Sequence, residues 1–313
     1  MGKIMIDTKY TEAEKLNPTD EIPKEEINLQ FHWYLSAFFV IYFTSFLIPA
    51  IIFMIFIMLI YLPFFLEVRS FIAIFTNLPS LIASLSFPLL IVICYLTHLF
   101  IVALITRWFW SVSEKKSPSK SGIIPRNIAS KTLNQYHFRS FLIKYPKNAF
   151  SRGLFPWLLK WMYNFVGSAK IGKGSVIEEQ LAGARFIEIG KNSYIGINSG
   201  VSAYLVEGIF GNISAAKVKI GDNFTAAAFN FVVPGVETGD NSWWLPITGA
   251  AKYSILKGNN YYFGVPLRRI FKKKVMDYLQ ITEDDLKRAE ELNKILDLKK
   301  DPIKKSERVH KND

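Results

Sequence analysis

The stretches Ile171-Gly-Lys-Gly-Ser175 and Ile189-Gly-Lys-Asn-Ser193 repeat one pattern at an interval of 18 residues, and Ile220-Gly221 is followed by Thr238-Gly239 at the same interval. Eighteen residues are three steps of six, and small or aliphatic residues fill the six-residue lattice at Ile177, Ile195, Val201, Ala226 and Val232. This period is typical of a parallel β-helix, in which each coil buries one apolar residue per flat side. The sequence therefore predicts a β-helix at about residues 169–255.

An irregular stretch at residues 203–219 separates the two regular pairs of coils. Ile189 and Ile220 lie 31 residues apart, which is one coil of 18 plus an insertion of 13. Insertions in repeat folds emerge as loops from one face and often carry binding groups. This stretch is therefore a candidate location for functional residues.

Two long apolar blocks precede the repeats. Residues 27–66 and 70–106 contain no Asp, Glu, Lys or Arg, and each block exceeds the roughly 20 residues that a helix needs to cross a bilayer. We expect transmembrane helices at about residues 33–62 and 81–106, joined by a lip with Pro63, Asn77 and Pro79. A buried hairpin of a soluble protein is the alternative, but soluble core helices are rarely apolar on every face for so long. The first block is also much too long for a cleaved signal peptide.

The orientation of this hairpin follows from the basic residues near its ends. The second block is followed by Arg107, Lys115, Lys116, Lys120 and Arg126, whereas the lip carries only Arg69. The positive-inside rule therefore predicts a two-helix membrane protein with both termini and the repeats in the cytoplasm.

The formal net charge of +12 is gathered in two places, residues 107–160 and the segment after residue 267. Basic residues near an anionic leaflet are attracted to it, and no nucleic-acid motif is visible, so we expect the lipid bilayer as a partner and no nucleic acid. The single cysteine, Cys94, lies in the second apolar block, so neither a disulfide framework nor a metal site is expected.

These features divide the chain of 313 residues into five segments. We predict a flexible cytoplasmic tail (1–30), a transmembrane hairpin (31–110), a basic juxtamembrane connector (111–166), a β-helix domain (167–275) and a C-terminal helix with a tail (276–313). The Ser/Lys/Pro-rich composition of residues 111–121 indicates a solvated linker. Thr282-Glu-Asp-Asp285 resembles a capping box, and helical spacing follows it at Leu286, Ala289, Leu292 and Leu296.

Aromatic clusters in the connector allow two interpretations. Trp157 and Trp161 are four residues apart and share one helical face, which suits the headgroup zone of a membrane. The same aromatics are equally suited to covering the end of the β-helix. The two interpretations are compatible.

Three elements of the sequence resemble the left-handed β-helix hexapeptide-repeat acyltransferases. They are the Ile-Gly coils, the run Val232-Val-Pro-Gly-Val-Glu-Thr-Gly-Asp240 and the run Tyr262-Phe-Gly-Val-Pro-Leu-Arg-Arg-Ile270. The resemblance covers about residues 165–275. It implies a left-handed coil, a trimer, and transfer of an acyl group from coenzyme A, with acyl-CoA or a carrier thioester as co-substrate and no tightly bound cofactor.

The third element is similar to the closing Gly-x-Pro-Ala of that family, which a basic residue follows, although Leu267 stands where the family mostly has alanine. The resemblance implies that the donor lies along Gly264, Pro266, Arg268, Arg269 and Lys272. Arginine suits phosphate oxygens, but attraction of the same cations to lipid headgroups is an equally good explanation.

A narrower likeness is to membrane-anchored members of the family. The transmembrane and β-helix units at the C-terminus of polylysine-type nonribosomal peptide synthetases have the same order of parts and a strand similar to Tyr204-Leu-Val-Glu-Gly208. Those proteins carry more helices and more than one soluble unit. The likeness implies a carrier protein as a possible partner.

The sequence departs from the family at the general base, which is ordinarily a histidine in or beside a coil. His32, His98, His137 and His310 all lie outside the repeats. The candidates for the base are therefore Glu207, in the irregular stretch, and His137, in the connector. A solvated or lysine-paired surface acid is the alternative for Glu207, and a surface or packing residue is the alternative for His137.

Polar residues at the coil corners are candidates for orienting the acceptor, namely Asn198, Ser202 and Asn230, although such residues are also common for solubility alone. The sequence thus favours a membrane-anchored acyltransferase-like protein acting on a membrane-proximal acceptor. A non-catalytic β-helix scaffold and an amide-forming unit of a peptide-synthetase-like assembly are the alternatives.

Overall fold

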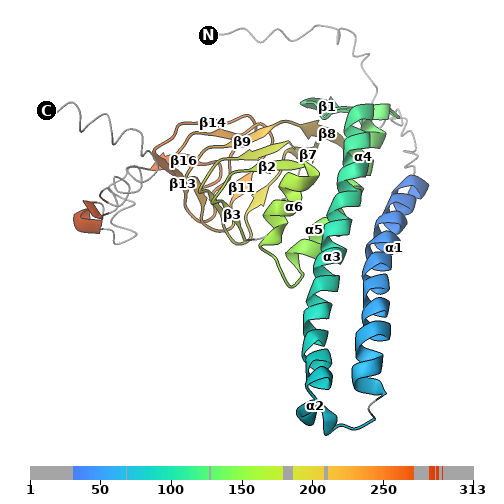
Figure 1. Ribbon diagram of the computed structural model, residues 1–313. Coiled ribbons are helices and arrows are strands. Elements are labelled where there is room, and N and C mark those ends of the chain that lie inside the picture. The colour runs from blue at the N-terminus through green and yellow to red at the C-terminus, as the bar shows by residue number, and fades with distance from the viewer. Residues whose placement is uncertain are drawn as a thin grey trace, which may run out of the picture.

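The computed structural model describes residues 31–67, 69–126, 128–178, 186–207 and 211–270, together with separate residues between 282 and 291. Two long helices stand side by side, and a domain of short strands lies beside one of them, with shorter helices between (Figure 1). The order of parts along the chain follows the sequence prediction of an apolar hairpin before a β-rich region.

The hairpin consists of α1 (Phe31–Phe56), which continues as the π-helical segment η1 (Ile57–Leu66), the short lip helix α2 (Ala73–Thr76), and α3 (Leu78–Lys116). The segments 31–64 and 78–116 are each long and apolar enough to cross a membrane. Asn77 is the N-cap residue of α3, and Pro79 lies in the first turn, where a backbone N–H would have no acceptor within the helix. The predicted helices at 33–62 and 81–106 lie inside these elements.

A proline inside α1 frees a backbone carbonyl that α3 then satisfies. Pro49 has no N–H to donate to the carbonyl of Ser45, four residues earlier. Nδ1 of the buried His98 lies 3.2 Å from that oxygen. Since a carbonyl can only accept, Nδ1 carries the proton in this contact. His98 therefore has a structural partner within the hairpin.

The β-rich domain is built of coils that visit three sheets in a fixed order. The first and longest all-parallel sheet contains β2 (Ala169–Ile171), β4 (Ile187–Ile189), β9 (Val218–Ile220), β12 (Glu237–Thr238) and β14 (Ile255–Leu256). The second contains β3 (Val176–Ile177), β5 (Tyr194–Ile195), β10 (Thr225–Ala226), β13 (Ser242–Trp244) and β15 (Asn260–Phe263), with β16 (Arg268–Ile270) antiparallel at its edge. The third contains β6 (Gly200–Val201) and β11 (Phe231–Val232), which Gly249 extends by a parallel bridge.

The register of these sheets follows the spacing in the sequence. Ile171 pairs with Ile189, and Ile189 pairs with Ile220 across the irregular stretch. The prediction that one coil contains an insertion of 13 residues is therefore confirmed. The parallel, three-sheet arrangement agrees with the predicted β-helix, while its left-handedness stays a prediction.

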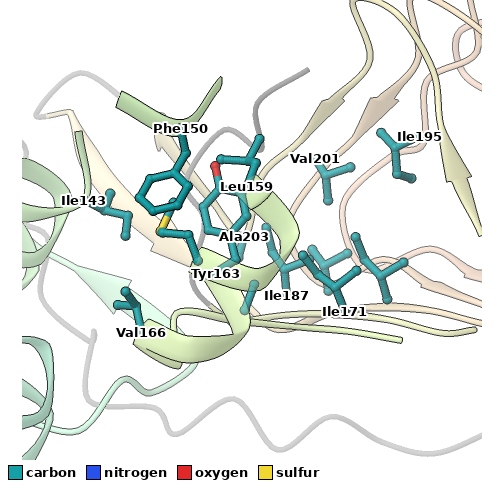
Figure 2. Close-up of a cluster of buried hydrophobic side chains, with 14 of the residues drawn as sticks. Ile143, Phe150, Leu159, Tyr163, Val166, Ile171, Ile187, Ile195, Val201 and Ala203 are labelled. Atoms are coloured by element: carbon teal, nitrogen blue, oxygen red, sulfur yellow. The ribbon is translucent and has the colours of Figure 1, made fainter. Parts of the chain in front are cut away.

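The predicted six-residue lattice forms the interior of the coils. Eight of its nine positions are buried and Ile177 is partly buried, as Figure 2 illustrates for Ile171, Ile195 and Val201. The column continues with the fully buried Trp244, whose strand partner is Ala226. The small alanine leaves room for the indole in the adjacent coil, so that the volume of the core is conserved.

Asparagines form a ladder at one corner of the coils. Asn192, Asn223, Asn241 and Asn259 all have positive φ, between 52° and 55°, which asparagine tolerates better than most residues. The Asn223 amide donates to Asn241 Oδ1 at 2.9 Å, and the Asn241 amide donates to Asn259 Oδ1 at 3.0 Å. The ladder ties three successive coils together by side chains.

The connector folds into α4 (Lys131–Leu142), α5 (Lys144–Ser151) and α6 (Leu158–Val166). α6 ends at Gly167, which has a φ of 81°, and covers the first coil, as the cluster of Leu159, Tyr163 and Val166 against Ile171 shows (Figure 2). Asn164 accepts from the backbone N–H of Ile171 and donates to its carbonyl, which satisfies the free edge of β2. The connector therefore does cover the end of the coils.

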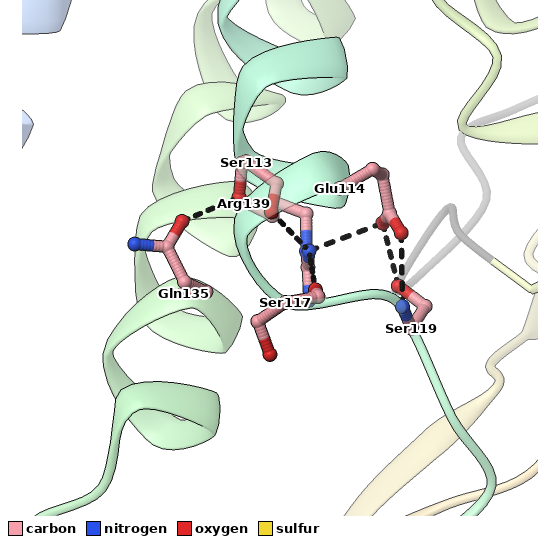
Figure 3. A network of polar contacts seen from close by, with 6 residues as sticks. All are labelled: Ser113, Glu114, Ser117, Ser119, Gln135 and Arg139. Atoms are coloured by element: carbon pink, nitrogen blue, oxygen red, sulfur yellow. Dashed lines mark hydrogen bonds and ion pairs between the residues drawn. The ribbon is translucent and has the colours of Figure 1, made fainter.

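The end of α3 differs from the expectation of a solvated linker at residues 111–121. α3 continues to Lys116, because the buried Arg139 of α4 donates to the carbonyl of Ser117 at 2.7 Å and lies 3.2 Å from Glu114 Oε1 (Figure 3). Glu114 also accepts from the backbone and the hydroxyl of Ser119. These contacts hold residues 113–119, within the stretch for which the composition predicted a solvated linker, against α4.

The insertion at residues 203–219 forms a hairpin. Its strands β7 (Tyr204–Glu207) and β8 (Asn212–Ala215) pair antiparallel, and β1 (Gly122–Ile124) of the connector adds to β8. The insertion thereby attaches the coils to the segment that follows α3.

Near the C-terminus, Thr282 and Asp285 exchange the hydrogen bonds of the predicted capping box. Leu286, Ala289, Leu292 and Leu296 lie outside the described residues.

Candidate functional site

Glu207 ends β7, at the point where the insertion hairpin lies over a later coil. Its two carboxylate oxygens accept from Lys252 Nζ at 2.6 and 2.7 Å, and the same ammonium donates to Ser214 Oγ at 3.1 Å. The side chain of Glu207 is 40% exposed, so solvent reaches the pair. The ammonium contacts both oxygens of the carboxylate, so a substrate would have to share Glu207 with Lys252. The geometry agrees with the lysine-paired alternative for this residue.

His137 lies on α4, in the connector, and is half-buried. Its ring meets that of Tyr136 edge to face, with centroids 5.5 Å apart. Tyr136 in turn packs against Tyr204 of the insertion. His137 thus belongs to the junction between the connector and the insertion hairpin, on a different element from Glu207.

The three residues proposed to orient an acceptor have different surroundings. Asn198 is an exposed corner residue with a φ of 53°. Ser202 donates to the carbonyl of Tyr204 at 2.7 Å, at the start of the insertion. Asn230 is fully buried, and its Oδ1 accepts from the backbone N–H of Thr248 at 2.8 Å. Asn230 therefore faces the interior of the coils, where it joins neighbouring turns.

The predicted donor-binding residues form a turn and an edge strand. Gly264 has a φ of 93°, a conformation that side chains strongly disfavour, and its carbonyl accepts from Gly249 N. β16 then runs antiparallel to β15, with Arg268 opposite Phe263 and Arg269 opposite Tyr262. Both arginines are exposed, and within the described ranges neither forms an ion pair. Lys272 lies outside the described residues.

The predicted catalytic and donor-binding groups do not form one hydrogen-bonded site in the described part of the chain. Lys252, the partner of Glu207, stands at the corner before the first sheet, whereas Arg268 and Arg269 lie at the edge of the second. The pairing of Glu207 with Lys252 was not predicted from the sequence. The two residues are 45 positions apart in the chain and belong to different coils, and the hairpin of β7 and β8 brings them together.

A shallow hollow of about 690 Å³ lies along the outer face of the first sheet. Ion pairs line this hollow: Lys170 pairs with Glu188, and Lys219 pairs with Glu237. A hydrogen bond from Lys217, supported by Lys170, lowers the pKa of Glu188 in spite of partial burial. Lys170 and Lys219 balance Glu188 and Glu237 in the lining, so that Lys217 beside Glu188 leaves an excess of only one positive charge for a polyanionic donor.

No protein-family model matches the sequence, and no curated protein matches it. Among solved structures, a maltose O-acetyltransferase from Clostridium difficile 630 is 18% identical with a TM-score of 0.29, and the match covers 36% of this chain and 73% of that chain. AntD, an N-acyltransferase from Bacillus cereus solved with dTDP and 3-hydroxybutyryl-CoA, is 16% identical with a TM-score of 0.25, covering 40% and 82%. A serine O-acetyltransferase from Brucella melitensis, named as a bacterial transferase hexapeptide repeat, is 12% identical with a TM-score of 0.25, covering 61% and 74%. These similarities are too weak for an activity or a substrate to follow from them.

Proposed function

We propose that this protein is a membrane-anchored acyltransferase-like protein, which transfers an acyl group from a CoA or carrier thioester to a membrane-proximal acceptor. The observation that carries the proposal is the closing element of the coils. Arg268 and Arg269 are exposed on β16, directly after the turn at Gly264, and have no acidic partner among the described residues. Two unpaired guanidinium groups beside an open backbone turn suit the phosphates of a thioester donor.

The proposal includes a left-handed β-helix and a trimer. Large apolar side chains stack along one corner of the coils and are exposed to solvent, namely Phe229, Ile247 and Val265, with Phe231 next to them. Monomeric proteins rarely leave such a column uncovered. A second and a third copy of the chain would cover it, and Ile247→Glu is expected to reduce the mass of the particle measured by mass photometry in detergent.

The proposal also places α1 and α3 in the bilayer with both termini in the cytoplasm. The apolar residues of α1 are exposed along its length, including Phe43, Leu47 and Met54. Lipid would cover these side chains, and anchoring would raise the local concentration of a lipid-linked acceptor. The exposed Trp157 would lie in the headgroup zone.

Catalysis by Glu207 requires Lys252 to release the carboxylate, for example to an incoming acceptor. If Glu207 is the general base, Glu207→Gln lowers turnover by about 100-fold or more, while Lys252→Met preserves the carboxylate and retains activity. If His137 is the base instead, His137→Gln lowers turnover and Glu207→Gln does not.

Donor binding gives the decisive test. Titration calorimetry of the full-length protein in detergent would measure the dissociation constant of acetyl-CoA. Changing both Arg268 and Arg269 to Ala should weaken this binding by about tenfold or more. Lys173→Ala is the matched control, because Lys173 is an exposed cation on the first coil, at the opposite end of the stack. Absence of binding to any thioester, free or carrier-bound, overturns the proposal.

A non-catalytic scaffold is the second candidate, and two observations favour it. The coils contain no histidine, and their best-placed acid is held by Lys252 at hydrogen-bonding distance. A scaffold predicts no turnover of acyl donors in the presence of membrane extracts. A third candidate, an amide-forming unit of a larger assembly, predicts that a carrier protein co-purifies with the hairpin.

A further inference from the structure

A cavity of about 540 Å³ opens between α1, α3 and α4, on the opposite side of α3 from the coils that α6 covers. This volume is in the range of sites that hold small molecules. The cavity does not include any of the candidate catalytic or donor-binding residues. It therefore needs an explanation of its own.

The walls of this cavity are apolar stripes on two helices. On α1, Trp33, Ala37 and Val40 follow one another at helical spacing, and on α3, Trp108 and Val112 do the same. The stripe on α3 runs eight helical steps from Trp108 to Lys116, or about 12 Å. Such a surface is suited to an extended hydrocarbon chain and offers it few polar atoms.

The mouth of the cavity is polar and basic. Lys116 continues the stripe of Trp108 and Val112 by one further turn and is exposed, with no ion pair in the described part of the chain. Gln135 accepts from the hydroxyl of Ser113 at 2.8 Å, and its amide nitrogen points away from that network (Figure 3). An ammonium and an amide donor at the end of an apolar channel are complementary to an acyl chain with an anionic headgroup.

The position of the cavity along the hairpin indicates that the bilayer would supply this hydrocarbon chain. Trp33 and Trp108 are 60% and 61% exposed at its rim, and Arg107 is the first charged residue after the apolar block of α3. Exposed tryptophans beside the first cation are typical of the membrane–water interface. We infer that the cavity between α1, α3 and α4 binds an anionic membrane phospholipid, with one acyl chain between the helices and the headgroup at Lys116 and Gln135. The inference rests on the proposed membrane placement and is independent of catalysis.

Photo-crosslinking tests this site on the full-length protein in nanodiscs. The nanodiscs contain phosphatidylglycerol and phosphatidylcholine, with a trace of one or the other lipid carrying a diazirine in its acyl chain. After irradiation, mass spectrometry of peptides locates the crosslinks. The expected result is preferential capture of the phosphatidylglycerol probe on the peptides that contain Val40 and Val112.

Matched variants separate the site from general contact with lipid. Val40→Trp fills the cavity and should abolish capture there, as should Ser36→Trp, whereas Val92→Trp changes a valine of similar exposure outside the cavity (46% and 37%) and should leave it intact. Lys116→Gln should lower the preference for the anionic probe by about fivefold, and Lys115→Gln should not.

Four outcomes would overturn the inference. One is equal capture of the two probes by wild-type protein, and another is unchanged capture in both tryptophan variants. Crosslinks elsewhere on α1 and α3 but none at the cavity would reject the site and leave the membrane placement intact. No crosslink on either helix would reject both the site and the membrane placement.

Discussion

The contact between His98 and the carbonyl of Ser45 yields a stringent prediction for the hairpin. Pro49 removes the N–H that would bond this carbonyl in a regular helix, and His98 Nδ1 replaces it at 3.2 Å. His98→Leu introduces an apolar side chain of similar size. It leaves the carbonyl of Ser45, a fully buried residue, without a hydrogen-bond donor. An unsatisfied buried acceptor costs about 1–3 kcal/mol, and the lower end applies if the helices find other partners in the membrane.

Pro49→Ala should restore the stability that His98→Leu removes. Pro49→Ala restores an N–H four residues after Ser45, so that His98→Leu should cost little when it is combined with Pro49→Ala. The two single variants and the double variant form a cycle, whose coupling free energy should be about 1–2 kcal/mol. The free energies come from denaturant unfolding of the purified protein in mixed micelles, followed by tryptophan fluorescence.

Thr97→Leu serves as the control for the cycle. Thr97 is the neighbour of His98 on α3, and its hydroxyl bonds only its own helix, at the carbonyl of Ile93. This change should lower stability equally in the wild-type protein and in the Pro49→Ala variant. A His98→Leu penalty that is the same in both backgrounds would refute the assignment of His98 to the carbonyl freed by proline.

Four further predictions concern the remaining contacts. Arg139→Met should expose the end of α3 and raise the rate of trypsin cleavage at Lys116 by about 30-fold, since loss of the buried cation and its charged hydrogen bonds to a half-buried Glu114 and to Ser117 costs about 2 kcal/mol; a change below twofold would contradict the network. Asn241→Ala should lower the free energy of unfolding by about 1 kcal/mol more than Asn241→Gly, because both lose the ladder bonds but only glycine accepts a φ of 54° without strain. Trp244→Ala should cost about 3–5 kcal/mol by denaturant titration, because the change leaves a large cavity beside Ala226 in the buried column. The pKa of Glu188 is lowered, so its contribution to stability is complete above its ordinary value of 4.5 and is lost as the pH falls through the lowered pKa; acid titration of Glu188→Gln should lack this loss.

The sequence was informative where one local rule acts on every residue. The six-residue lattice predicted the buried column and the pairing of Ile189 with Ile220, because each flat side of a coil must bury its apolar residue. It did not predict where the helix ends within residues 111–121, whose Ser, Lys and Pro content indicated a solvated linker: most of these residues are exposed, but the first six belong to α3. α3 continues there because Arg139, more than 20 residues away, supplies a buried cation that the composition of the linker does not reveal.

The surroundings of the candidate site residues depended more on the tertiary structure than the repeat pattern did. The sequence singled out Glu207 by its place in the irregular stretch and gave a lysine-paired acid as the alternative, but it did not identify the lysine. Lys252 lies 45 residues further along the chain, and the hairpin of β7 and β8 brings it within 2.6 Å. Asn230 was attractive as a polar corner residue, and only the packing of the coils shows that its side chain is inside.

The sequence by itself determined the two apolar helices, the repeating coils and the interior column, since length, hydropathy and period act through neighbours in the chain. Only the tertiary structure decided the partners of single polar groups, such as His98 with Ser45 across 53 residues and Glu207 with Lys252. The cavity between α1, α3 and α4 belongs to the second class, because three segments far apart in the chain form its walls. The physical reason is that a buried polar group or a cavity is defined by what surrounds it in space, and the residues on either side of it in the chain do not specify those surroundings.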